Sequence, residues 1–192
     1  MGLGLISQER AREIMGRNMF GVEEAIRHFG VNPTKQQAAA LSEIPFNKAT
    51  LKQRRKTHVL AAVFPISILE IRGKAVADQR LFQNQDWYND ESFAEKKGET
   101  DLPAGQAGWK LVRKTPVANY KKTPTARVMV YTVIGHFLAT GERLFENGYV
   151  YCNDLASDCG RVLVGDFGRC GLDISTADGI AAARDVLASS LP

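Results

Sequence analysis

Apolar and polar residues recur at helical spacing in three short stretches near the beginning of the chain. The first stretch starts at Ser7, whose hydroxyl is expected to cap a helix, and the second ends at Gly30. The third is stopped by Pro45, because proline cannot continue a helix. The pattern therefore predicts a helical N-terminal segment over residues 1–45, followed by one larger domain over residues 46–192.

Longer apolar runs in the middle of the chain predict buried strands and one buried helix. Residues 57–73 are rich in β-branched side chains and are expected to form strand, broken by Pro65. A short amphipathic helix from about Asp90 precedes a second strand at residues 109–117. Residues 125–145 predict the clearest helix, which is mostly apolar and is therefore expected to pack on two sides. Its apolar positions at helical spacing are Val128, Tyr131, Ile134, Leu138 and Phe145.

The last quarter of the chain predicts short strands separated by glycine and aspartate turns. The expected strands cover residues 149–152, 161–167 and 171–175, with a further one at residues 179–184. Alternation along a strand makes some positions inward-facing and leaves others free to vary. Together with the preceding helices, this pattern predicts a mixed α+β fold.

The same last quarter uses a reduced set of amino acids. Residues 1–146 use Lys, Glu, Gln, Met and Trp 36 times, so residues 147–192 should hold about 11 at the same rate. They hold none, although they mix aromatic, aliphatic, small and acidic residues as a folded segment does. These are the amino acids that no codon ending in cytosine encodes. Variable codons of the form NNC would produce this composition.

The net charge of +4 is unevenly distributed along the chain. Residues 1–146 carry 22 basic and 15 acidic side chains, whereas residues 147–192 carry 3 and 6. The basic body is compatible with nucleic-acid binding, for example through a helix-turn-helix at residues 25–41. The only tight basic cluster, KQRRK at residues 52–56, is more simply explained as the solvated face of a helix. Nucleic-acid association is therefore an alternative function.

All three cysteines, Cys152, Cys159 and Cys170, lie in the last quarter of the chain. Their spacing matches no zinc motif, and neither a metal nor another cofactor is expected. Free thiols are typical of a reducing cytoplasm. No apolar run approaches the roughly 20 residues that cross a bilayer, and the start lacks a signal-peptide core. The sequence therefore predicts a cytoplasmic protein without a membrane span.

Candidate catalytic side chains do not form a recognisable motif. Cys152, His136 and Asp154 could in principle act as nucleophile, base and orienting group, but no local signature supports that assignment. A single histidine in an apolar helix is more often a core residue. An enzyme of unidentified chemistry is the second alternative.

The end of the chain, with RVLVGDFGRCGLDIS and GIAAAR, resembles the variable region of proteins targeted by diversity-generating retroelements. In these systems an error-prone reverse transcriptase misreads adenines, so that AAC codons of a template repeat become NNC codons in the target gene. The body resembles a family of uncharacterised bacterial hypothetical proteins. That resemblance is carried by REIMGRNMFGVEEAIRHFG, THVLAAVFPISILEIRG, WKLVRKTPV and ARVMVYTVIGHFLATGERLFE.

The resemblance implies a C-type-lectin-like domain over residues 46–192, with a variable region at about 147–192. It implies a non-enzymatic binding protein whose partner is a protein or surface ligand selected by the variable side chains. Tyr, Asn, Ser, Asp and Gly suit such a surface, because they combine flat contact area with adaptable hydrogen bonding. The expected scaffold positions are Val162, Val164, Phe167, Leu172 and Ile174. The expected ligand-binding positions are Tyr151, Asp154, Asp158, Asp166, Arg169, Asp173 and Ser175.

Overall fold

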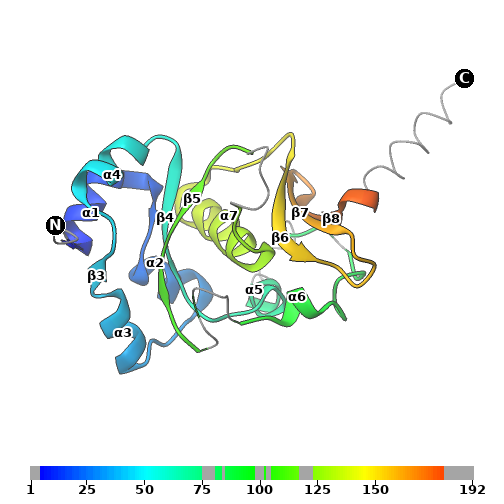
Figure 1. The fold of residues 1–192 in the computed structure, drawn as a ribbon, viewed down its shortest axis with the longest axis horizontal. Coiled ribbons are helices and arrows are strands. Elements are labelled where there is room, and N and C mark those ends of the chain that lie inside the picture. Colours follow the sequence, from blue (N-terminus) through cyan, green and yellow to red (C-terminus); the bar gives the residue numbers. More distant parts are fainter. Residues whose placement is uncertain are drawn as a thin grey trace, which may run out of the picture.

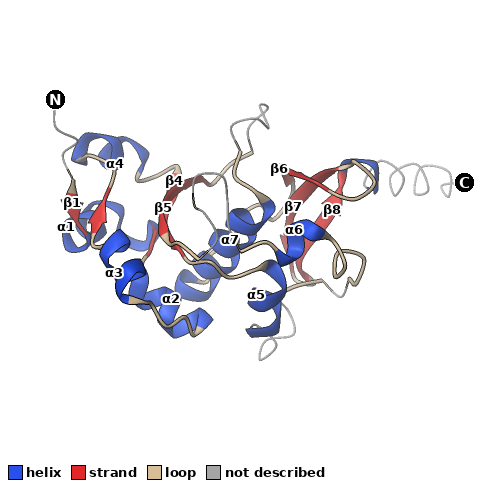
Figure 2. Ribbon diagram, turned by 60° about the horizontal axis from the view of Figure 1, so that its bottom comes forward, coloured by secondary structure: helices blue, strands red, loops and turns tan. Residues whose placement is uncertain are grey.

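In the described part of the computed structural model, three small β-sheets and a set of short helices accompany one long helix, which lies between two of the sheets (Figures 1 and 2). The structure describes residues 5–74, 81–83, 85–97, 102, 105–116 and 123–179. Its helices are α1 (Gln8–Met15), η1 (Gly16–Asn18), α2 (Val22–Phe29), α3 (Lys35–Leu41), α4 (Lys48–Arg54), α5 (Ile68–Lys74), α6 (Ser92–Glu95) and α7 (Ala126–Thr140). Its strands are β1 (Ile6–Ser7), β2 (Met19–Phe20), β3 (Glu43–Ile44), β4 (His58–Val63), β5 (Gly108–Arg113), β6 (Tyr149–Leu155), β7 (Arg161–Gly168) and β8 (Gly171–Thr176). The predicted mixed α+β class is confirmed.

The sheets differ in size and strand direction. β1 and β3 form an antiparallel pair. In the second sheet, of order β2-β4-β5, β2 runs parallel to β4 and β5 runs antiparallel to it. The third sheet, of order β6-β7-β8, is antiparallel throughout.

Helix α7 lies between the second and third sheets and contacts both of them (Figure 1). Every residue from Ala126 to His136 is buried, so the expectation that this helix packs on two sides is confirmed. Gly135 permits the close approach of β2, because a Cβ atom there would lie 2.8 Å from the ring of Phe20. The helix ends at Thr140, earlier than predicted, because Gly141 adopts the left-handed conformation that caps helices.

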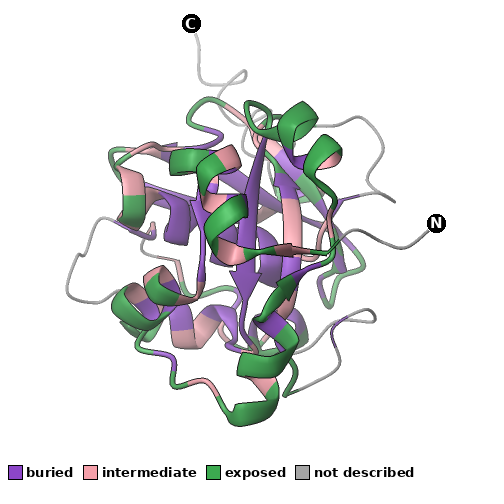
Figure 3. Cartoon of the chain, turned by 90° about the vertical axis from the view of Figure 1, so that its left-hand side faces the viewer, coloured by how far each residue is buried: buried purple, intermediate pink, exposed green. Residues whose placement is uncertain are grey.

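The N-terminal segment contributes to the same hydrophobic core as the rest of the chain. The three predicted helices are present as α1, α2 and α3, and Met19 and Phe20 extend the sheet beside β4. The indole nitrogen of Trp109 donates a hydrogen bond to the carbonyl of Leu41. Figure 3 shows the exposed sides of the N-terminal helices in front of the buried strands. Residues on both sides of the expected boundary at residue 45 therefore share one core.

The expectation of strand across residues 57–73 is correct for β4 and wrong for the residues that follow it. All six residues of β4 are buried, but the chain turns into α5 at Ile68. The Ser67 hydroxyl accepts a hydrogen bond from the Glu70 backbone N–H, and the Glu70 carboxylate accepts one from the Ser67 N–H. This reciprocal capping box starts a helix where the apolar run alone suggested strand.

Replacing Ser67 by alanine should destabilise the protein by about 1 kcal/mol, because the first turn of α5 loses its cap. The measurement is the free energy of unfolding from urea titration followed by circular dichroism. Ser92→Ala is a suitable control, because Ser92 is exposed at the first position of α6 and does not cap that helix. Equal stability of the two variants would contradict a role for the capping box.

The strands predicted in the last quarter are present as β6, β7 and β8. The five expected scaffold positions, Val162, Val164, Phe167, Leu172 and Ile174, are all buried and belong to the hydrophobic core. The further strand expected at residues 179–184 lies outside the described residues except for Gly179.

Candidate functional site

The sheet β6-β7-β8 is built entirely from the segment with the reduced amino-acid set. Strand β6 alternates strictly between buried and exposed side chains from Val150 to Leu155. Tyr151 is 46% exposed and Leu155 is 49% exposed, although both are large and apolar enough for a core. One face of β6 therefore packs inward, and the other presents aromatic and aliphatic groups to the surroundings.

The strand register brings two of the predicted ligand-binding residues into one row. Tyr151 lies opposite Leu163 on β7, and Leu163 lies opposite Ser175 on β8. Leu163 is buried, whereas Ser175 is half-buried. We call Tyr151, Leu155 and Ser175 the outer-face patch.

Three other predicted residues lie at opposite ends of this sheet. Asp158 is in the turn between β6 and β7, where its carboxylate accepts a hydrogen bond from the Gly160 N–H. Asp166 is exposed near the end of β7, and Arg169 is exposed in the turn that follows. The length of β7 separates the two turns by roughly 25 Å at the usual rise per residue. The structure therefore keeps Asp166 and Arg169 apart from the outer-face patch, whereas Asp158 lies in the turn that directly follows Leu155.

Asp154 is buried and acts on the central helix, so its expected contact with a ligand is not supported by its position. Its side chain is 7% exposed, and Oδ2 accepts a hydrogen bond from the Ala126 backbone N–H at 2.6 Å. Lys96 lies 3.6 Å from Oδ1. A carboxylate at the first turn of α7 compensates free N–H groups and the positive end of the helix dipole.

Asp173 is also buried, with 6% of its surface exposed. Its carboxylate accepts hydrogen bonds from the Gln85 amide and from the Tyr149 hydroxyl. These contacts join β8 to β6 and to the segment before α6. Asp173 therefore serves the structure of the sheet and is not directly available to a partner.

Trp87 was not among the predicted residues, yet it lies against the third sheet. Its indole nitrogen donates a hydrogen bond to the carbonyl of Ile174 on β8, and 40% of the residue is exposed. No local sequence pattern relates Trp87 to a strand 87 residues later. Only the tertiary structure places an exposed aromatic group beside Ser175.

A second candidate site is a pocket of about 240 Å³ on the other side of α7 from the third sheet. It is lined by Arg12, Gly16, Arg17, Met19, Glu24, Arg27, His28, Ala139 and Thr140. Arg12 donates a hydrogen bond of 2.7 Å to Glu24, whose same oxygen accepts the Gly21 backbone N–H. Burial alone would raise the pKa of Glu24, but the hydrogen bond and charge of Arg12 outweigh it and lower that pKa. No local sequence pattern indicates this pocket, because its arginines come from three separate elements, α1, η1 and α2.

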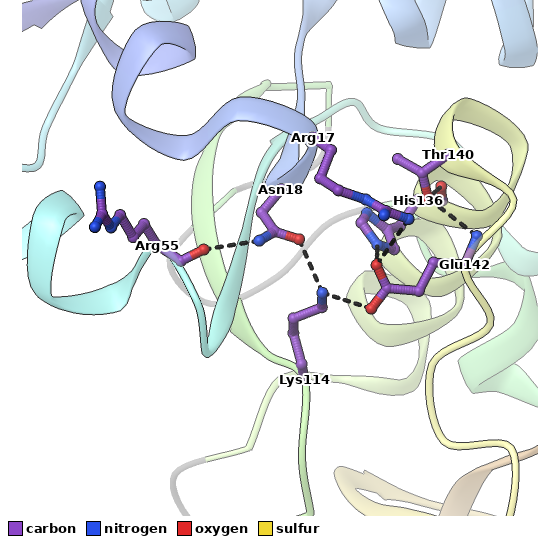
Figure 4. Close-up of polar contacts among 7 residues, drawn as sticks. All are labelled: Arg17, Asn18, Arg55, Lys114, His136, Thr140 and Glu142. Atoms are coloured by element: carbon purple, nitrogen blue, oxygen red, sulfur yellow. Dashed lines mark hydrogen bonds and ion pairs between the residues drawn. The ribbon is translucent and has the colours of Figure 1, made fainter.

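One of these arginines also belongs to a charged cluster at the end of α7 (Figure 4). Glu142 accepts a hydrogen bond from Lys114 at 2.6 Å and another from His136 at 3.3 Å, and it lies 3.1 Å from Arg17. Lys114 in turn donates to the side chain of Asn18. The cluster thus ties β5, η1 and the end of α7 together.

The protonation of this cluster favours a structural role. Burial lowers the pKa of His136, so its imidazole is neutral near pH 7. Burial would raise the pKa of Glu142, but hydrogen bonds from Lys114 and His136 outweigh that effect and lower it. A carboxylate held ionised by these donors is a weak base.

The residues considered for catalysis make separate contacts. The Cys152 thiol donates to the Val150 carbonyl, His136 contacts Glu142, and Asp154 caps α7. Within the described ranges, no group of three or more His, Cys, Asp or Glu side chains is placed to hold a metal ion.

Two further expectations concern the surface of the molecule. The basic cluster at residues 52–56 is exposed at the end of α4 and before the buried β4. Among the described residues, the helices are all too short or too polar to cross a membrane.

Comparison with known proteins identifies no matching family model, and no significantly similar curated protein or solved structure.

Proposed function

We propose that this chain is a non-enzymatic binding protein that contacts a protein partner through the outer-face patch of its C-terminal sheet. The observation that carries the proposal is the coincidence of two boundaries. The reduced amino-acid set begins at residue 147, and the sheet with the exposed Tyr151 and Leu155 begins at Tyr149. Within the described residues, the segment of special composition thus forms one sheet, and exposed side chains stand on the outward face of β6.

The exposed side has the chemistry of an adaptable protein-binding surface. Tyr151 offers a large, rigid and amphipathic contact at low cost in side-chain entropy. Leu155 adds apolar area, Ser175 adds a hydroxyl group, and Trp87 extends the aromatic surface beside β8. These groups stand on a sheet face, and such a face suits contact with another folded protein.

The proposal includes diversification of this surface by a retroelement and a C-type-lectin-like fold. The missing amino acids support NNC codons, and the mixed α+β fold with a C-terminal antiparallel sheet is compatible with display of variable side chains. It also includes a cytoplasmic location, in keeping with the exposed free thiols of Cys159 and Cys170.

The genetic part of the proposal is tested by sequencing the gene and several kilobases beside it. We expect codons ending in cytosine at the exposed positions of residues 147–192, and a near-copy repeat that differs at adenines. A nearby reverse-transcriptase gene would complete the system. Ordinary codon endings without a repeat would refute diversification.

The physical part predicts that the outer-face patch tolerates substitution. Tyr151→Ser and Leu155→Ser should each change the free energy of unfolding by no more than about 1 kcal/mol, because roughly half of each residue is already exposed and mainly a cross-strand contact is lost. Val164→Ser is the matched inward variant on the same sheet and should lose considerably more stability. Urea unfolding of the purified variants measures all three. Losses for the exposed positions as large as that for Val164 would show that the patch is part of the scaffold.

The alternative of nucleic-acid association keeps one supporting observation, the exposed basic residues at the end of α4. Salt-sensitive binding of duplex DNA that is lost when residues 52–56 are neutralised would favour it over the proposal.

A further inference from the structure

We propose that the pocket between α1, η1, α2 and the end of α7 binds a small molecule that carries a phosphate group. This site lies apart from the outer-face patch, so its function would be independent of the partner proposed for that patch.

The lining of the pocket has an excess of positive charge. Arg12, Arg17 and Arg27 line it, whereas Glu24 is its only acidic side chain among the described residues. A guanidinium group has five N–H donors, so one carboxylate partner leaves several donors for a ligand. Arginine recognises phosphate oxygens through paired hydrogen bonds. This geometry favours an anion with several oxygens, such as phosphate, over a monatomic anion.

Two of the arginines are held in place by carboxylates, and the third is available. Arg12 is fixed by Glu24 at 2.7 Å, and Arg17 is fixed by Glu142 at 3.1 Å. Arg27 forms no ion pair with any residue in the described part of the chain. An anion would therefore find two oriented donors and one uncompensated charge, which lowers the ordering cost of binding.

His28 also lines the pocket, beside Arg27. Burial lowers the pKa of His28, the charge of Arg27 lowers it further, and Glu24 acts in the opposite direction. The lowered pKa of His28 thus comes mainly from burial, and the positive charge of Arg27 adds to it.

The size and the apolar part of the lining define the class of ligand. A volume of about 240 Å³ is smaller than the roughly 300–1,000 Å³ typical of pockets for drug-sized molecules. It exceeds what a few waters need, and Met19 and Ala139 supply apolar contacts for the group that bears the phosphate. A small phosphate monoester fits these properties better than a polymer, which needs an extended basic track.

The test is isothermal titration calorimetry of the full chain with inorganic phosphate and with glycerol phosphate, and acetate is the comparison anion. We expect both phosphate probes to bind more tightly than acetate, with affinity that decreases as the salt concentration rises. Arg27→Gln should weaken phosphate binding by at least about tenfold, because a charged hydrogen-bond donor is removed. The matched control is Arg10→Gln on α1, whose side chain is exposed and does not line the pocket.

A second readout guards against an indirect effect of the substitution. The ring signals of His28 in nuclear magnetic resonance spectra should shift with added phosphate, whereas those of His58 should not, because His58 lies on β4 outside the pocket. The proposal is overturned if phosphate produces neither heat nor a His28 shift at millimolar concentration. Equal phosphate affinity of the Arg27 and Arg10 variants would overturn it as well.

Discussion

Replacing Gly165 by alanine should destabilise the protein by about 3 kcal/mol or more and disrupt the C-terminal sheet. Gly165 lies in the middle of β7, opposite Tyr149 on one side and Asp173 on the other. A Cβ atom there would overlap the carbonyl oxygen of Gly148 and would lie 2.7 Å from the Cα atom of Tyr149. These are backbone atoms, so no side-chain rotation can relieve the overlap.

The measurement is the free energy of unfolding, with thermal unfolding as a second probe. Gly148→Ala is the matched control, because a Cβ atom at that position meets nothing within 4 Å. Displacement of β6 by the Gly165 variant would also move Tyr151, and with it the outer-face patch. Similar stability of the two variants would mean that the strands are not packed as closely as the structure shows.

Replacing Asp154 by alanine should cost about 2–3 kcal/mol of stability, although the sequence predicts it as a variable ligand contact. The substitution removes a charged acceptor from the Ala126 N–H and leaves the buried start of α7 without that partner. Because α7 is packed between two sheets, weakening its first turn affects the core and not only the local helix.

Urea unfolding followed by the helical circular dichroism signal measures this effect. Asp178→Ala is the control, because Asp178 is an exposed aspartate in the same segment and should change stability by less than about 0.5 kcal/mol. If Asp154→Ala is as stable as Asp178→Ala, then the hydrogen bond from the Ala126 N–H contributes little to stability and this prediction is refuted.

Several elements follow from local patterns in the sequence. The apolar spacing of residues 125–145 predicts α7, and the β-branched run after residue 57 predicts β4. The five scaffold positions of the last quarter are buried as the alternation indicates. These predictions succeed because periodicity is a local property that directly sets which face of an element is apolar.

The sequence also contains signals for the start of α5 and for the burial of Asp154, which apolar spacing alone does not reveal. The spacing of Ser67 and Glu70 is a capping box, and it overrides the strand propensity of the apolar residues around it. In β6, Asp154 lies two residues after Cys152 and four after Val150, and both of these residues are buried. The two-residue period of a strand therefore places Asp154 on the inward face.

Local sequence patterns do not predict the positions of Asp173, Trp87 and the three pocket arginines. Asp173 points to the opposite face of β8 from its neighbours Leu172 and Ile174. Its burial depends on Gln85 and Tyr149 from distant parts of the chain. The pocket likewise exists only because α1, η1 and α2 meet the end of α7.

The sequence by itself determined the amino-acid set of the C-terminal segment, the mixed α+β class and the inward positions of its strands and central helix. Tertiary structure alone decided which outward positions stay exposed, which aspartates became internal hydrogen-bond acceptors and where arginines gather. The physical reason is that periodicity fixes the direction of a side chain relative to its own element. Whether that side chain meets solvent, another element or an opposite charge depends on contacts between residues far apart in the chain.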